Sequence, residues 1–165
     1  MGDYVSMSRL AMEFKKESDR TSAEIRGAVS YLLSRHQTYR RLSFSSLCAW
    51  VDPAIDLGQI RVFYDQHGRR PVGYVTWAFL TSEVEMQWQS DPTFILHQSE
   101  WNEGDRLWFV DLVAQPSYCL DICRLIMLEM FPGQTVAYSL RRGSNGRMTR
   151  VRTWQRDHAL TEILR

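Results

Sequence analysis

A short apolar run near the middle of the chain constrains the fold more than any other feature of the sequence. Residues 107–113 (LWFVDLV) are apolar except for Asp111, and such a run is typical of a central strand covered on both faces. A buried carboxylate is costly unless it is paired or hydrogen-bonded. Asp111 therefore either turns toward solvent or a strand end through the two-residue period of the strand, or holds a histidine as in a catalytic dyad.

The patterns before and after this run predict several helices. Thr21 and Glu24 have capping-box spacing and predict the start of a helix that extends to about residue 36. Apolar residues at helical spacing also predict helices within 7–14, from Phe44 to no later than Pro53, and over 118–130.

Alternating and β-branched segments predict the strands of a sheet. Residues 60–64 and 72–80 flank a turn and predict a hairpin, and residues 136–140 and 148–154 predict two final strands around a turn at 143–146. Residues 81–104 are polar and irregular, with one helical turn expected at 94–97. This order predicts one α/β domain over residues 1–165, with helices on both faces of a mixed central sheet.

Four histidines are possible partners of Asp111, and the helical pattern favours His36. It is the last residue of an apolar stripe on one helix face, so partial burial is expected, although a lone histidine there is more often a core residue. Spacing alone does not show that His36 meets Asp111. Ser34 lies two residues before His36 and is a poor nucleophile for it, because i and i+2 side chains of a helix point apart. The other histidines are expected in a turn, an irregular segment and a basic tail: His67, His97 and His158.

Charge and cysteine content exclude several classes of protein. A net charge of +1 does not indicate a nucleic-acid-binding protein. Three cysteines predict reduced thiols and a cytoplasmic setting, and Cys119 and Cys123, without partner histidines, make a poor zinc site. No apolar run is long enough to span a bilayer, the first 20 residues lack the apolar region expected of a secretory signal, and common nucleotide-binding and hydrolase motifs are absent. A local cationic patch is formed by Arg141, Arg142, Arg147, Arg150, Arg152 and Arg156.

Four segments of the chain carry a further pattern. They are Ser34-Arg35-His36; Asp52-Pro53-Ala54-Ile55 followed by Gln59; the hairpin segment 70–78 (RPVGYVTWA); and the block 100–111 (EWNEGDRLWFVD). In this order they resemble the toxin-activating lysine acyltransferases of RTX toxins, whose pattern E-W-x-x-G-D-x-x-W-x-x-D the last block matches. The resemblance as a whole is expected to cover roughly residues 30–155.

The resemblance implies a fold related to the GNAT acetyltransferases, acyl carrier protein as acyl donor and an internal lysine of an RTX-type protoxin as acceptor. It implies that His36 and Asp111 are catalytic, that no cofactor is bound beyond the carrier's phosphopantetheine thioester, and that the protein forms a homodimer. The cationic patch is expected to attract the acidic carrier, and tryptophans are expected to line an acyl groove, although core packing explains any one of them as well. Supporting or substrate-binding roles are implied for Ser34, Gln59, Tyr74, Trp77, Gly104, Asp105 and Trp108.

The chain departs from the family pattern directly after Asp111. The segment 112–117 (LVAQPS) replaces an Ala-Pro-Phe-Gly-like turn, so donor binding is expected to differ if that turn contacts the carrier. Three alternatives stay open: an acceptor that is a bacteriocin or another exported peptide, a GNAT enzyme that uses acetyl-CoA, and a non-catalytic module that binds nucleic acid through its basic patch. The lack of a Gly-rich pyrophosphate loop argues against the second, and the lack of any nucleic-acid motif argues against the third.

Overall fold

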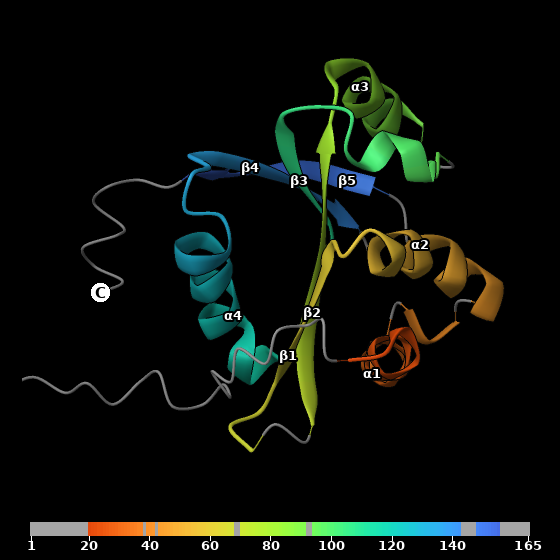
Figure 1. The fold of residues 1–165 in the computed structure, drawn as a ribbon, viewed down its shortest axis with the longest axis vertical. Helices are drawn as coiled ribbons and strands as arrows, with labels where there is room; N and C mark the ends of the chain where they lie inside the picture. The colour runs from red at the N-terminus through yellow and green to blue at the C-terminus, as the bar shows by residue number, and fades with distance from the viewer. Residues whose placement is uncertain are drawn as a thin grey trace, which may run out of the picture.

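Five strands form one sheet in the order β1-β2-β3-β4-β5 (Figure 1). The computed structural model describes residues 20–37, 39–41, 43–67, 70–91, 94–142 and 148–155. Neighbouring strands are antiparallel except β3 and β4, which are parallel, so the predicted mixed sheet is confirmed. The strands are β1 (Ile60–Tyr64), β2 (Pro71–Leu80), β3 (Arg106–Ala114), β4 (Val136–Arg142) and β5 (Met148–Gln155).

Helices cover both faces of the sheet, as predicted (Figure 1). α1 (Ser22–Arg35) and α2 (Phe44–Asp56) lie on one face, and α4 (Cys119–Leu125), which continues into the π-helical turn η5 (Ile126–Met130), lies on the other. No helix among the described residues has both the length and the apolar character needed to cross a bilayer. The helical pattern at 7–14 and the turn at 143–146 lie outside the described residues. Three short 3-10 turns are η2 (Tyr39–Arg41), η3 (Gln98–Trp101) and η4 (Pro116–Tyr118).

α1 begins where its capping box predicts. Thr21 Oγ1 accepts a hydrogen bond from the Glu24 amide (3.2 Å), and Glu24 Oε2 accepts one from the Thr21 amide (2.8 Å). These two bonds satisfy amides that the first turn of a helix otherwise leaves free.

The predicted end of α2 is wrong, because the helix continues through Pro53 to Asp56. A proline inside a helix donates no hydrogen bond to the preceding turn. The two residues that follow it, Ala54 and Ile55, are buried in the core. Their burial removes apolar surface from water and offsets the missing bond.

The polar segment 81–104 is more ordered than its pattern predicts. α3 (Ser82–Ser90) begins at Thr81, whose Oγ1 accepts a hydrogen bond from the Val84 amide (3.3 Å). The buried side chains of α3 are Val84 and Trp88, and two apolar residues among polar ones give too weak a periodic signal to identify a helix. The helical turn expected at 94–97 occurs later, at η3.

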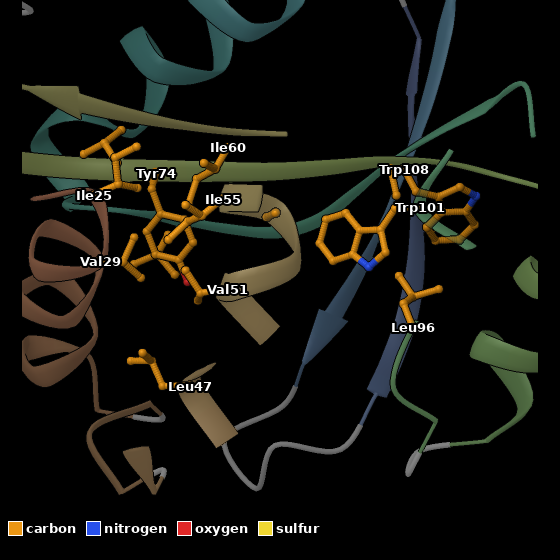
Figure 2. Packing of buried hydrophobic residues seen from close by; sticks show 14 of the residues in the cluster. Ile25, Val29, Leu47, Val51, Ile55, Ile60, Tyr74, Leu96, Trp101 and Trp108 are labelled. Carbon is orange, nitrogen blue, oxygen red and sulfur yellow. The ribbon is translucent and has the colours of Figure 1, made fainter. Parts of the chain in front are cut away.

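The larger core lies between the sheet and the pair α1 and α2 (Figure 2). Val29 of α1 and Val51 of α2 pack around Tyr74, while Trp101 and Trp108 form the other end of the cluster. β3 is the central strand and contributes to both cores, as predicted for the run 107–113. The smaller core, toward α4, contains Phe63, Val72, Val75, Leu107, Phe109, Ile122, Ile126 and Ala137.

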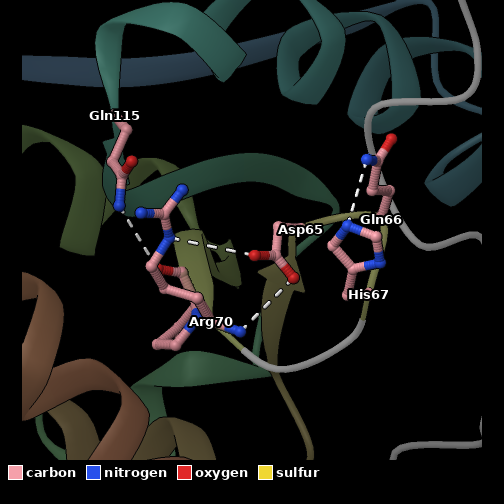
Figure 3. A network of polar contacts seen from close by, with 6 residues as sticks. Asp65, Gln66, His67, Arg70 and Gln115 are labelled. Carbon is pink, nitrogen blue, oxygen red and sulfur yellow. Dashed lines mark hydrogen bonds and ion pairs between the residues drawn. The ribbon is translucent and has the colours of Figure 1, made fainter.

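Polar contacts hold the turn between β1 and β2 (Figure 3). The Asp65 amide donates to the Arg70 carbonyl (3.0 Å), and the Asp65 carboxylate accepts a hydrogen bond from the Arg70 amide (3.4 Å) and lies 3.8 Å from Arg70 Nε. Gln115, which follows β3, donates to the Pro71 carbonyl (3.4 Å) and ties the turn to the sheet. His67 lies exposed in this turn, as predicted.

Gly104 lies where the chain passes β2 before it enters β3. Its amide donates to the Phe79 carbonyl (2.9 Å), and a Cβ here would lie 1.9 Å from the Leu80 carbonyl oxygen. We predict that Gly104→Ala lowers the free energy of unfolding by about 1–3 kcal/mol, measured by urea denaturation, because the backbone must move to admit the methyl group.

Gly133→Ala is the control, since no atom lies within 4 Å of the Cβ that it adds. Its free energy of unfolding should change by less than about 0.5 kcal/mol. Equal stability of the two variants would contradict the packing argument.

Candidate active site

A β-bulge in β3 sets the direction of Asp111. Thr76 of β2 pairs with Asp111, but the next residue, Trp77, pairs with Phe109, so Val110 is an extra residue in β3. Val110 and Asp111 therefore both line one hollow beside α2, whereas Phe109 packs toward α4. Strict alternation along the strand would have turned Asp111 to the same face as Phe109.

Three donors hold the Asp111 carboxylate. The Tyr39 hydroxyl donates to Oδ1 (2.8 Å), the Leu112 amide donates to the same oxygen (3.1 Å), and the Tyr74 hydroxyl donates to Oδ2 (2.5 Å). The Asp111 amide donates in turn to Thr76 Oγ1 (3.1 Å). Asp111 is half-buried, and the side chains that donate to its carboxylate are two tyrosines, where the dyad interpretation expected a histidine.

His36 lies at the exposed end of α1. It is the C-cap residue with φ −91° and ψ 126°, so the chain leaves the helix here and the apolar stripe ends before the imidazole. The expectation of partial burial is wrong, because the side chain is exposed. Its ring packs edge-on against Tyr39, with centroids 4.9 Å apart and planes at 64°. One side chain, Tyr39, thus touches both predicted catalytic residues.

A hollow opens beside Asp111 and is walled by α2, α3, the sheet and the segment 94–101. Its empty volume of about 490 Å³ includes open solvent at the mouth. Polar groups come from Asp111, Tyr74 and Thr76. The rest of the wall is largely apolar and includes Trp50, Trp88, Phe94, Ile95, Leu96 and Trp101.

Tyr74 is the predicted supporting residue that lines the hollow. Gln59 is buried away from this wall, and its Nε2 donates to Asn102 Oδ1 (2.9 Å). Trp108 is buried and stacks on Tyr138 with centroids 5.3 Å apart. Neither side chain belongs to the wall of the hollow.

The remaining predicted supporting residues also lie outside the wall of the hollow. Trp77 packs on Phe131 at the α4 face, with centroids 5.4 Å apart. Ser34 is exposed and donates its hydroxyl to a carbonyl of its own helix (2.8 Å). Gly104 crosses β2 closely, and Asp105 next to it is exposed.

The exposed arginines of β5 lie on the other face of the sheet. Arg152 is placed over the Trp154 ring, 5.6 Å from its centroid, and Trp154 packs on Phe109 toward α4. Arg150 shares this face, because residues two apart on a strand point the same way. The described side chains of the cationic patch therefore face away from Asp111.

Two further arginines of the predicted patch lie at the end of β4. Arg141 pairs in register with Arg150, and Arg142 pairs with Met148. Arg147 and Arg156 lie outside the described residues, as does His158.

The cysteines are free thiols. Burial raises the pKa of Cys48, and burial together with the neighbouring Cys119 raises the pKa of Cys123 to about 12. Both thiols are therefore protonated at neutral pH and are poor nucleophiles. In the part of the chain that the structure describes, no three His, Cys, Asp or Glu side chains are grouped to hold a metal ion.

Sequence reasoning missed two residues that hydrogen-bond with Asp111, Tyr39 and Thr76. Tyr39 lies in the turn η2, where no periodic pattern distinguishes it, and it meets a carboxylate 72 positions away. Thr76 stands inside the hairpin segment that carries the family resemblance. Its contact with Asp111 becomes visible only once the pairing of β2 with β3 is known.

Comparison with known proteins agrees with the resemblance. Residues 18–155 match the model of the RTX toxin acyltransferase family. The chain is 33% identical over 91 residues to a leukotoxin-activating lysine-acyltransferase of Aggregatibacter actinomycetemcomitans, covering 55% of this chain and 52% of the relative. It is 35% identical over 88 residues to the RTX-II toxin-activating lysine-acyltransferase of Actinobacillus pleuropneumoniae, covering 53% of each.

A third relative is a protein-lysine myristoyltransferase of Escherichia coli. It is 35% identical over 92 residues, which cover 55% of this chain and 52% of the relative. The chain thus spans about half the length of the curated relatives that it matches.

We predict that Thr76→Val lowers the free energy of unfolding by about 1–3 kcal/mol, because the isosteric valine leaves the Asp111 amide without its acceptor. Thr76 is 1% exposed, so water does not readily replace the hydroxyl. Urea denaturation measures the loss, and faster hydrogen exchange of the Asp111 amide would locate it.

Thr153→Val, at an exposed position of β5, is the matched control and should change stability by less than about 0.5 kcal/mol. A Thr76→Val protein as stable as this control would show that the bulge does not need the hydroxyl.

Proposed function

The chain belongs to the RTX toxin acyltransferase family, and we propose that it is a protein-lysine acyltransferase that moves a fatty acyl group from acyl carrier protein to an internal lysine of an RTX-type protoxin. The observation that carries this proposal is the Asp111 carboxylate at an aromatic hollow, linked through Tyr39 to the exposed His36. The names of the relatives, which are lysine acyltransferases, support the reaction.

The hollow suits the acyl chain of the donor. Its aromatic and aliphatic wall would remove methylene groups from water, which is worth about 0.8 kcal/mol for each buried CH₂. Asp111 belongs to the same wall, so a chain bound here would have its thioester within reach of the polar groups of the site.

His36 would act as the general base of the transfer. Its exposed ring is open to a lysine of a large acceptor, and it takes the proton of the amine as the nitrogen attacks the thioester carbonyl. The C–N bond forms, the C–S bond breaks, and the leaving thiolate recovers the proton from the imidazolium. In a second route His36 attacks the thioester carbonyl first, and the C–S bond breaks as the carrier thiolate leaves. The lysine amine then attacks the acyl-imidazole, the C–N bond to the imidazole breaks, and the amine gives up its proton to the released imidazole. In both routes the negative charge of Asp111 stabilises the positive charge that develops on the imidazole.

The proposal also includes a GNAT-related fold, a homodimer and an acidic acyl carrier as partner. The mixed sheet with helices on both faces is compatible with a relation to the GNAT acetyltransferases, and a homodimer remains part of the proposal. Exposed arginines of β5 would speed the encounter with an acidic carrier by long-range attraction. Such attraction does not require these arginines to face the hollow, from which β5 turns them away.

We predict that His36→Ala abolishes acyl transfer and that Asp111→Asn slows it by roughly 100-fold or more, because the base is lost in one variant and its charge partner in the other. The measurement is the intact mass of an RTX-type protoxin after incubation with acyl-loaded carrier protein, in which transfer adds the mass of one acyl group.

His67→Ala is the matched control, since His67 is exposed in the β1–β2 turn, and it should keep wild-type transfer. Full activity of the His36→Ala protein would show that His36 is not the general base.

Ala49 provides a test of the hollow as the acyl site. It is an exposed residue of α2 that lines the hollow, so a large side chain is tolerated by the helix but narrows the mouth. We predict that Ala49→Trp slows transfer of a long acyl chain by about tenfold relative to a short one, because pocket size discriminates between chains that differ in methylene groups.

The comparison is made with carriers loaded with each chain. Ser45→Trp, at an exposed position of the same helix outside the hollow, should leave the ratio of the two rates unchanged. An unchanged ratio in Ala49→Trp would place the acyl chain elsewhere.

A further inference from the structure

We propose that Tyr39 is the positioning residue of this site, which fixes the Asp111 carboxylate through its hydroxyl and the His36 imidazole through its ring. The inference rests on the proposed function, since the geometry of His36 and Asp111 affects a rate only if these residues carry the transfer.

Two contacts on opposite parts of the Tyr39 side chain carry the argument. The hydroxyl donates to Asp111 Oδ1 at 2.8 Å, and the ring meets the imidazole of His36 edge-on at 4.9 Å between centroids. The first contact reaches the central strand of the sheet, and the second reaches the end of α1. Tyr39 therefore joins the two elements that bear the predicted catalytic residues.

The backbone around η2 prepares this position. The His36 amide donates to the Leu33 carbonyl (3.1 Å), and the Arg40 amide donates to the His36 carbonyl (3.0 Å). These bonds close a turn directly after α1, and the turn places Tyr39 against the imidazole that precedes it by three residues.

Trp50 supports the same ring from α2. Its indole meets Tyr39 with centroids 6.4 Å apart and planes at 84°, a T-shaped arrangement that is favourable for aromatic pairs. Trp50 also lines the hollow, whereas Tyr39 is not part of that wall. Tyr39 is thus held beside the hollow without contributing to its lining, so its hydroxyl is expected to affect turnover and not the binding of the acyl donor.

The Asp111 carboxylate is held from two elements at once. Tyr74 of β2 donates to Oδ2 and Tyr39 of η2 donates to Oδ1, which leaves the carboxylate plane one orientation that satisfies both. Without the Tyr39 hydroxyl the carboxylate keeps Tyr74 and the Leu112 amide but loses its bond to the segment that carries His36.

Tyr39→Phe tests the hydroxyl alone, because phenylalanine keeps the ring contacts with His36 and Trp50. We expect kcat to fall on the order of 10- to 100-fold, as for the loss of a hydrogen bond to a charged group, with the KM of the acyl carrier unchanged within about twofold. Tyr118→Phe removes the hydroxyl of a half-buried tyrosine on the α4 face and should leave kcat unchanged. A kcat of Tyr39→Phe equal to that of this control overturns the proposal.

A double-mutant cycle separates positioning from a general structural role. If Tyr39 acts through Asp111, Tyr39→Phe should cost far less in an Asp111→Asn background than in the wild type, because residues that act as one unit are not additive. An equal loss in both backgrounds overturns the proposal.

An NMR readout that needs no catalysis distinguishes failure of this inference from failure of the proposed function. Among the ring signals of the 4 histidines, those of His36 are identified with His36→Ala. We expect Tyr39→Phe and Asp111→Asn to move them and Tyr118→Phe to leave them in place. If Tyr39→Phe moves the His36 signals but the wild-type protein transfers no acyl group, the link between Tyr39 and His36 is supported and the proposed function is rejected. Signals that stay in place in Tyr39→Phe overturn the link in either case.

Discussion

The extra residue Val110 in β3 is the constraint on which the arrangement of the site depends. Before it, Trp108 packs in the larger core, where it meets Trp88 of α3, and Phe109 packs toward α4; after it, Leu112 packs toward α4 again. On a regular strand Asp111 would enter the smaller core, which is built from apolar side chains, and an ionised carboxylate there would be costly. The bulge brings the Asp111 carboxylate to two tyrosine hydroxyls, and Thr76 Oγ1 accepts a hydrogen bond from the Asp111 amide.

Local signals were sufficient to predict most elements, but the site depends on how distant elements meet. The capping box of α1 and the β1–β2 hairpin act within a few residues, so the sequence alone identifies them. α2 continues through Pro53 because later residues of the helix are buried, and this burial is a property of the whole fold. A bulge changes which face a strand presents without any marker in the segment 107–113. The sequence could therefore identify Asp111 as a costly carboxylate but could not predict the face on which it lies.

Some residues that carry the family resemblance line the hollow, and others only support the fold. Their spacing in the sequence does not distinguish the two groups. Within the block 100–111, Trp101 and Asp111 line the hollow, whereas Gly104 passes a neighbouring strand and Trp108 fills the core. The apolar stripe of α1 favoured His36, yet the stripe ends before it and the ring is exposed. Tyr39 and Tyr74 lie 72 and 37 positions from Asp111, and contacts over such separations follow from the register of the sheet and the course of η2. A sequence pattern can therefore identify the family from residues that support the fold, and still not identify the residues that hydrogen-bond to the Asp111 carboxylate.

The hollow follows from the way in which the larger core divides. At one end α1 and α2 pack around Tyr74, and at the other end Leu96 and Trp101 pack near Trp108 (Figure 2). The hollow draws its wall from both groups, and Val110 and Asp111 contribute to it together. The proposed donor, a fatty acyl thioester, would need an apolar wall for its chain and polar groups for its carbonyl within the length of one molecule. Because a single inserted residue turns an apolar side chain and a carboxylate to the same face, β3 supplies both at adjacent positions. A regular strand, on which neighbouring side chains point to opposite faces, could not do so.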